Sequence, residues 1–201
     1  MNLNPGLALI IAMVAGYLAG SIPFGVIFSR WMTRIDPRDG GSRNIGFTNV
    51  LRTAGRAPAA LTLMGDLGKG YLAVRFAQYL SIGESGDWLA GIAAVLGHNY
   101  PVFLGFKGGK GVATGLGVLY GIQPMVGWIA VILWGGTVLL SRFSSLGALV
   151  AFGVSPLLIL FLRPAPLNVF FSLILTGLIL IRHTANIQRL RSGTEPKIGR
   201  A

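Results

Sequence analysis

The sequence contains no cysteine and few charged residues. Without cysteine, the chain can form no disulfide, no thiol nucleophile and no cysteine metal site. Only 11% of its 201 residues are charged and 53% are hydrophobic, whereas about a quarter of a soluble domain is charged. A chain of this length cannot bury so many apolar side chains in its own interior. The lipid bilayer is therefore the expected solvent.

Acidic residues are also scarce, since six Asp and Glu stand against 17 Lys and Arg, for a net charge of +11. Nucleic-acid-binding proteins can have such a balance. Here, however, the positive residues cluster beside apolar runs, as the loop charges of membrane proteins do. We therefore expect no nucleic-acid partner. No metal-ligand cluster is recognisable either, and no metal or cofactor is expected.

Long apolar runs predict an all-α integral membrane protein with about seven transmembrane helices, forming a single polytopic domain over residues 1–201. The first run, 5–28, carries no charge, and no Lys or Arg precedes Arg30. The positive region of a secretory signal is therefore missing, and this first helix is expected to remain in the mature protein. Six further apolar runs follow, at 58–80, 88–104, 111–122, 124–141, 145–162 and 165–182.

The stretch 111–141 is uncharged throughout. A helix of that length, at 1.5 Å per residue, would far exceed a hydrocarbon core of roughly 30 Å. Gln123-Pro124 lies inside the stretch, and proline disfavours helix in the residue before it. We therefore interpret the stretch as two short crossings. The alternative is five crossings in all, with 111–141 partly re-entrant.

The positive residues predict the orientation. Lys and Arg are in excess in cytoplasmic loops, and most of the 17 here fall in the segments 29–57, 105–110, 142–144 and 183–201. Seven crossings place all four segments on the same side of the membrane. The N-terminus, with Met1, is then outside, and the tail that contains Arg200 is cytoplasmic. Five crossings keep the same parity.

Most of the polar motifs fall on that cytoplasmic side. They are "GGSRNIGFTNVLR" at 40–52, "GHNYPVFLGFKGGKGVATG" at 97–115 and "RHTANIQRLRSGTEPK" at 182–197, with "GDLGKG" at 65–70 within reach. Their convergence on one face indicates a single site there, not a pathway through the membrane. A small transporter or channel for organophosphates would need polar residues along a continuous path and paired repeats, and neither is visible. A non-catalytic lipid-binding subunit is the third candidate class.

The Gly-rich stretch "FKGGKGVATG" at 106–115 resembles a phosphate-binding loop, but it is not a nucleotide P-loop. Leu104 stands where Walker A needs its first glycine, and Gly111 replaces the Ser or Thr after Lys110. Glycines still allow successive backbone N–H groups to point into one concavity beside a cation. We therefore predict that this stretch binds phosphate, through Lys107, Gly108, Gly109, Lys110 and Gly111.

Other polar residues are candidates by spacing. Thr48 and Arg52 are four apart and face one way on a helix, which favours anion binding there. Asp66 and Lys69 are three apart and can form a structural ion pair inside the membrane. His183 follows Arg182 and precedes Asn186 by three, which gives the end of the last helix a polar face.

The five ordered motifs, which include "GSIPFG" at 20–25, resemble the bacterial acyl-phosphate glycerol-3-phosphate acyltransferases over nearly the whole chain. The resemblance implies acyl transfer from acyl phosphate to the 1-hydroxyl of glycerol 3-phosphate, giving lysophosphatidic acid in the first step of phospholipid synthesis. It also implies a multi-pass protein of the bacterial plasma membrane with its site at the cytoplasmic face. An upstream enzyme that forms acyl phosphate is a candidate partner.

The family's substrate-phosphate and catalytic positions correspond to residues in three of the motifs. They are Ser42, Asn44, Thr48, Arg52, Lys110, His183 and Asn186. The chain departs from the family at two places, since Arg43 replaces a usual glycine and Phe47 a usual alanine. The loss of glycine at 43 weakens any claim that the backbone there needs a positive φ. Phe47 would crowd the site or pack on the acyl chain.

Both implied substrates carry phosphate, so the site must hold two anionic groups side by side. Acyl phosphate is already activated, and positioning and charge stabilisation could supply most of the acceleration without a covalent acyl-enzyme. No Ser–His–acid triad is recognisable. The base for the attacking hydroxyl is either His183 or a phosphate oxygen of a bound substrate, and the sequence leaves both open.

Overall fold

The computed structural model describes residues 4–199, and this part of the chain contains helices and no β-strand. The elements in chain order are α1 Pro5–Ser21, α2 Phe24–Thr33, α3 Phe47–Thr53, α4 Arg56–Tyr79, α5 Gly83–Asn99, the 3₁₀ helix η1 Val102–Leu104, α6 Val112–Ile122, α7 Pro124–Ser141, α8 Ser144–Leu162, α9 Pro166–Arg182 and α10 Thr184–Arg191. The expected positions of Met1 and Arg200 relative to the membrane concern residues outside the described range.

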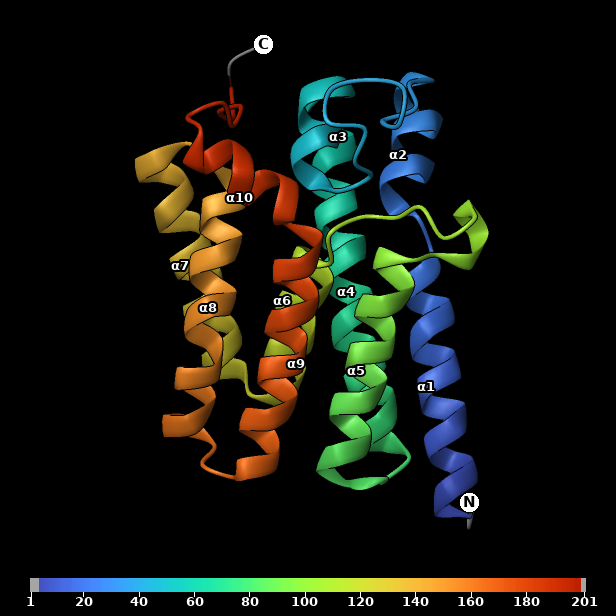
Figure 1. The fold of residues 1–201 in the computed structure, drawn as a ribbon. Helices are drawn as coiled ribbons and strands as arrows, with labels where there is room; N and C mark the ends of the chain where they lie inside the picture. Colours follow the sequence, from blue (N-terminus) through green and yellow to red (C-terminus); the bar gives the residue numbers. More distant parts are fainter. Residues whose placement is uncertain (1–3, 200–201) are drawn as a thin grey trace.

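The long helices run side by side along one direction, from α7 and α8 at one edge of the bundle to α1 at the other (Figure 1). α9 packs on α8 and α5, while α4 packs on both α5 and α6. The two termini lie at opposite ends of the bundle, and the short helices α3 and α10 lie at the end where the chain finishes (Figure 1). Polar motifs far apart in the sequence thereby reach the same end.

Two of the predicted spans have different bounds in the structure. The run 5–28 is not one helix, because α1 ends at Ser21 and α2 begins at Phe24. Pro23 lies at the break, and proline has no backbone N–H to continue a helix. The helix predicted at 88–104 corresponds to α5, which begins earlier, at Gly83, and ends earlier, at Asn99. Pro101 follows closely, and proline disfavours helical conformation in the residue before it.

By length and composition, three stretches of residues 4–199 can each cross a membrane: Pro5–Thr33, α7 and α8. A fourth is added if α9 and α10, which are bent by 63°, are counted together. The protein is thus an integral membrane protein with several candidate spans. Seven crossings would also need three more helices: α4, which carries Asp66 and Lys69; α5; and α6, whose 11 residues extend only about 17 Å.

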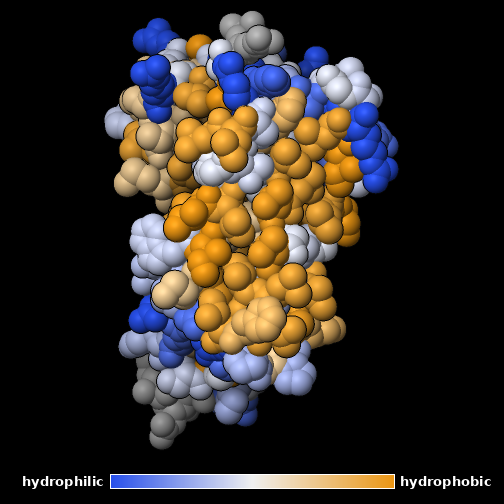
Figure 2. Space-filling view, turned by 90° about the vertical axis from the view of Figure 1, so that its left-hand side faces the viewer, coloured by the Kyte–Doolittle hydropathy of each residue, from blue (hydrophilic) through white to orange (hydrophobic). Residues whose placement is uncertain are grey.

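The surface supports a membrane-embedded bundle. Figure 2 shows hydrophobic residues over a broad central band, with hydrophilic residues gathered toward both ends. On α7, for example, Ile132, Leu139 and Leu140 are between 67% and 91% exposed. In water such a band would be unfavourable, whereas lipid tails are as apolar as the side chains themselves.

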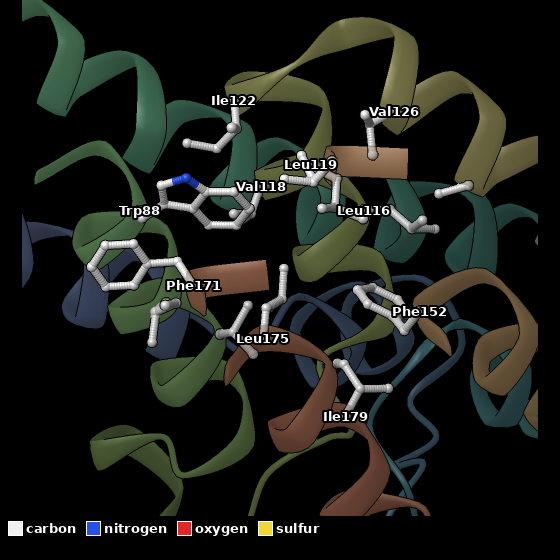
Figure 3. Close-up of a cluster of buried hydrophobic side chains, with 14 of the residues drawn as sticks. Trp88, Leu116, Val118, Leu119, Ile122, Val126, Phe152, Phe171, Leu175 and Ile179 are labelled. Carbon is white, nitrogen blue, oxygen red and sulfur yellow. The ribbon is translucent and has the colours of Figure 1, made fainter. Parts of the chain in front are cut away.

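The interior of the bundle is apolar between α5, α6, α8 and α9 (Figure 3). Trp88 is fully buried and stacks on Phe171, with ring centroids 6.2 Å apart. Phe152, Leu175 and Ile179 extend the cluster toward the end where α10 lies. This close packing holds in place the ends of the helices that line the polar pocket.

Candidate active site

A pocket lies at the end of the bundle that carries α3 and α10. Segments far apart in the chain contribute to it. They are α3 with the loop before it, α4, the end of α5, the first half of α6 with the loop before it, α7, the start of α8, and the residues from the end of α9 into the tail. The predicted site residues that line it are Ser42, Asn44, Thr48, Arg52, Asp66, Lys110, Gly111, His183 and Asn186. Residues about 140 positions apart in the sequence therefore share one cavity.

Three residues of the Gly-rich stretch do not line this pocket. Lys107 is exposed, and Gly108 and Gly109 pack against the end of α5. The Gly109 N–H donates to the His98 carbonyl oxygen at 2.9 Å, and a Cβ at Gly109 would lie 1.9 Å from His98 Nε2. Arg182 donates to the carbonyl oxygens of Gly108 and Gly109. These two glycines thus allow close packing that holds the loop of Lys110 in place.

Lys110 is joined to the tail by a chain of short hydrogen bonds. Its Nζ donates to Asn186 Oδ1 at 2.6 Å, and Asn186 Nδ2 donates to Glu195 Oε1 at 2.6 Å. Glu195 also accepts from Ser145 at 2.6 Å and from Arg189 Nε at 2.7 Å. Asn186 therefore orients the Lys110 ammonium toward the pocket, and Glu195 orients Asn186.

The charge state of this network depends on burial. Burial lowers the pKa of Lys110 to about 8, with the cations Arg189, Arg182 and Arg52 acting in the same direction and Glu195 opposing them. Burial alone would raise the pKa of Glu195, but hydrogen bonds from Ser145, Asn186 and Arg189 hold it below its usual value. At pH 7 the pocket therefore contains a charged ammonium and a paired carboxylate.

His183 lies between α9 and α10, after the last predicted span, and only 2% of it is exposed. Its Nδ1 is 2.8 Å from the Ile179 carbonyl oxygen. A carbonyl can only accept, so Nδ1 carries the proton and Nε2 is a free acceptor. Burial lowers the pKa of His183 to about 4. The ring is therefore neutral at pH 7, ready to accept a hydrogen bond from a hydroxyl.

The loop before α3 contains a backbone conformation that the sequence analysis did not expect. Gly41 has φ +58° and Arg43 has φ +56°. In the sequence analysis the absence of glycine weakened the case for a positive φ at position 43, yet the structure has one there. The loop imposes the left-handed conformation and arginine adopts it, at a cost of about 1 kcal/mol relative to glycine.

The wall formed by α3 combines polar and aromatic contacts. Thr48 and Ser144 share a hydrogen bond of 2.8 Å between their hydroxyl oxygens. Phe47 packs edge-on against Trp134, with ring centroids 6.2 Å apart, and both line the pocket. Phe47 thus contributes an apolar wall. Within residues 4–199, the Arg52 guanidinium forms no ion pair, so its charge is available in the pocket.

The ion pair lies beneath the pocket, between α4 and the break in the first span. Lys69 Nζ is 2.8 Å from Asp66 Oδ1, and both side chains are 3% exposed. Lys69 also donates to the Ile22 carbonyl oxygen at 3.1 Å, beside the break at Pro23. His98 Nδ1 lies 3.5 Å from the same Asp66 oxygen. The pair thus ties α4 to the break between α1 and α2.

The sequence analysis did not single out several lining residues, among them Glu195, Ser145 and Arg189. Glu195 carried the one available signal, because it is the only acidic residue in the tail 183–201. No group of three or more His, Cys, Asp or Glu that could bind a metal ion occurs within the described residues. The pocket is instead cationic, with neutral hydrogen-bonding side chains around Arg52 and Lys110.

These features define an integral membrane protein of helices with a cationic pocket at one end of its bundle. A model of the glycerol-3-phosphate acyltransferase family matches residues 10–193. The chain belongs to this family and is a membrane enzyme of phospholipid synthesis.

Relatives match the chain over nearly its whole length. It is 49% identical over 195 residues to the glycerol-3-phosphate acyltransferase of Jannaschia sp. (strain CCS1), covering 96% of this chain and 95% of the relative. It is 48% identical over 206 residues to that of Bordetella petrii, covering 97% and 96%.

Two crystal structures of PlsY (YgiH), an integral membrane glycerol 3-phosphate acyltransferase, resemble the fold. The glycerol 3-phosphate form has a TM-score of 0.89 at 36% identity, covering 95% of this chain and 96% of that one. The lysophosphatidic acid form has a TM-score of 0.86 at 35% identity, covering 95% of each.

Proposed function

We propose that the enzyme transfers an acyl group from acyl phosphate to the 1-hydroxyl of glycerol 3-phosphate, giving lysophosphatidic acid and phosphate. The observation that carries this proposal is the meeting of Arg52, Lys110 and the neutral His183 in one pocket. Two cations match the two phosphate groups, and a neutral imidazole nitrogen matches a hydroxyl. The relatives whose structures contain glycerol 3-phosphate and lysophosphatidic acid support the same substrate and product.

The residues divide into two groups. Arg52, with Ser42, Asn44 and Thr48 from the same loop and helix, binds a substrate phosphate. Gly111 allows the chain to approach closely, since its φ is +77° and a Cβ there would lie 2.9 Å from Asn99 Oδ1. Lys110, Asn186 and His183 lie nearer the reacting atoms. Lys110 stabilises phosphate charge, and Asn186 holds its ammonium through the 2.6 Å hydrogen bond.

In the reaction, the glycerol hydroxyl oxygen attacks the acyl carbon and forms the ester bond. The bond between that carbon and the phosphate oxygen then breaks, and phosphate leaves with the electron pair. The hydroxyl proton passes to a phosphate oxygen of a bound substrate, while His183 Nε2 orients the hydroxyl. A covalent acyl-enzyme is not needed, and Ser145, the buried serine of the pocket, donates to Glu195 and not to a histidine.

The donor preference provides one test. Purified enzyme is expected to use acyl phosphate directly, with no metal and no nucleotide, because the pocket offers cations for a phosphate leaving group. Acyl transfer is measured with acyl phosphate, and with the acyl thioester of the same chain length, in the presence and absence of a chelator. Equal or greater activity with the thioester would contradict the proposed donor. Transport of glycerol 3-phosphate into vesicles without acylation would favour the transporter class instead.

The seven crossings, the external N-terminus and the cytoplasmic site make up the proposed topology. The absence of native cysteine allows single cysteines to be placed at Gly40 and Thr194 on the cytoplasmic side and at Ser81 on the outside. In intact cells, an impermeant thiol reagent is expected to label Ser81→Cys and neither of the other two variants. Gly40→Cys and Thr194→Cys are expected to be labelled only after the cells are lysed. External labelling at position 40 or 194 would overturn this orientation.

A further inference from the structure

Asn49 lies next to Thr48 on α3 but has no role in the reaction as proposed. It is 2% exposed, and the hydrogen bonds of its side-chain amide all go to backbone atoms of the preceding loop. Its Oδ1 accepts from the Ser42 N–H at 2.8 Å. Its Nδ2 donates to the carbonyl oxygens of Pro37 at 2.7 Å and Asn44 at 2.9 Å, with a longer contact of 3.3 Å to Gly40. One amide thus joins four points of the loop 37–44.

The orientation of this amide is determined by its partners. Three of them are carbonyl oxygens, which accept only, and the fourth is an N–H, which donates only. The nitrogen must therefore face the carbonyls and the oxygen must face Ser42. Both N–H groups of the amide are used, so the side chain has no donor left for a phosphate of the substrate. Asn49 itself lines the pocket beside the loop residues Ser42 and Asn44, and its hydrogen bonds go to the backbone of that loop.

Gly41 provides a second, independent observation. Its φ is +58°, and a Cβ built there would lie 2.3 Å from Asn49 Oδ1. The loop backbone therefore lies so close to the Asn49 amide that position 41 has no room for a side chain. The glycine and the asparagine are matched to each other, because a residue with Cβ would displace the amide from Ser42.

We propose that Asn49 is a positioning residue that sets the conformation of the loop 37–44, so that Ser42 and Asn44 meet a phosphate group of the substrate. The inference rests on the proposed function, in which these residues bind that phosphate. If the amide were removed, the backbone N–H and C=O groups that it binds would need other hydrogen-bond partners. The loop has no regular secondary structure that could supply such partners. Without Asn49 the loop samples other conformations. Only a fraction of the molecules then has the conformation that binds substrate, which lowers the affinity for glycerol 3-phosphate.

The test is Asn49→Ala in the full-length enzyme. We expect the KM for glycerol 3-phosphate to rise about tenfold while kcat at saturation changes by less than about threefold, since the reacting groups are unchanged. Amide hydrogen exchange of the segment 37–46 is expected to become faster. Unchanged KM and unchanged exchange in a folded Asn49→Ala would overturn the proposal, and so would a loss in kcat alone.

Asn168 offers a matched control, because it is 1% exposed and also holds a buried amide network. It accepts from Trp88 Nε1 at 2.8 Å and donates to Glu84 Oε2 at 3.3 Å. Asn168→Ala is expected to lower thermal stability without raising KM or loop exchange. If both variants raise KM equally, the effect is general destabilisation and the positioning role is wrong.

A double-mutant cycle with Gly41→Ala tests the matching directly and remains available if Asn49→Ala folds poorly. Gly41→Ala alone is expected to raise KM, because its Cβ displaces the Asn49 amide. In the Asn49→Ala background the same change is expected to raise KM by a smaller factor, since the clash with Oδ1 is gone. Equal factors in both backgrounds would show that the two residues act separately, against the proposal.

The wild-type enzyme and Ser42→Ala separate this inference from the function on which it rests. If wild type does not acylate glycerol 3-phosphate with acyl phosphate, the proposed function fails. If wild type is active and Ser42→Ala raises KM while Asn49→Ala does not, the function stands and only the positioning role fails.

Discussion

Replacing Lys110 with alanine is expected to lower kcat/KM by on the order of 10²-fold or more. The ammonium is held in the pocket by Asn186 at 2.6 Å, and Asn186 is held by Glu195. Of the neighbouring cations, Arg189 is paired with Glu195 and Arg182 with the carbonyl oxygens of Gly108 and Gly109. A charge-assisted contact to phosphate that strengthens as the leaving group forms accounts for several kcal/mol. Steady-state kinetics with both substrates varied measure the loss.

Lys107→Ala is the matched control, because Lys107 is a lysine of the same loop that is exposed and does not line the pocket. We expect it to retain nearly full activity. An equal loss in both variants would mean that the whole Gly-rich stretch binds phosphate, as the sequence pattern predicts. Full activity in Lys110→Ala would contradict the role of Lys110.

The pKa of Lys110 adds a pH dependence with a definite sign. Burial lowers this pKa to about 8, so the ammonium of the free enzyme loses its proton as pH rises through that value. We expect kcat/KM to fall above about pH 8 in wild type. Lys110→Arg, if active, should keep its affinity to higher pH, because a guanidinium remains charged. Arg52→Ala should also lose on the order of 10²-fold, and it should move this fall to somewhat higher pH, because Arg52 is one of the cations that lower the pKa of Lys110.

Replacing His183 with alanine is expected to raise the KM for glycerol 3-phosphate more than it lowers kcat. A general base works best with a pKa near the operating pH, and the pKa of His183 is lowered to about 4. Such an imidazole is a weak base at pH 7, but its Nε2 accepts a hydrogen bond well. In the proposed mechanism it therefore binds and orients the hydroxyl, while a substrate phosphate oxygen takes the proton.

The alternative role of His183 predicts a different result. If His183 is the obligatory base, His183→Ala should lower kcat by roughly 10²–10⁴-fold with little change in KM. That outcome would contradict the binding role. His183→Gln, which can still offer an acceptor oxygen, is expected to recover part of the affinity if the ring only orients the hydroxyl.

Much of the helical framework could be predicted from the sequence. Apolar runs of membrane length gave the positions of α4 and of α6 to α9 to within a few residues, because burial in lipid requires such runs whatever the tertiary fold. Pro124 marked the division of 111–141, since its effect on the backbone is local. Pro23 has the same local effect, but the sequence analysis interpreted the uncharged run 5–28 as one helix and did not predict the break between α1 and α2.

The Gly-rich loop shows what the sequence pattern could not decide. It indicates that glycines and lysines are gathered, but not which face of the loop meets the pocket. The end of α5 and Arg182 determine that face, and they leave Lys110 inside and Lys107 outside. Such contacts depend on how distant helices pack, and no property of residues 106–111 contains that information.

By itself, then, the sequence determined a membrane-embedded helical protein with its polar motifs gathered toward one face, and it named Arg52, Lys110 and His183 as candidates. Only the tertiary structure decided the finer chemistry. Glu195 becomes the acceptor that orients Asn186 because α8 and α10 bring Ser145 and Arg189 to it. Apolar periodicity and charge are local and can be read along the chain, whereas hydrogen bonds between segments exist only once packing has placed their atoms within about 3 Å of each other.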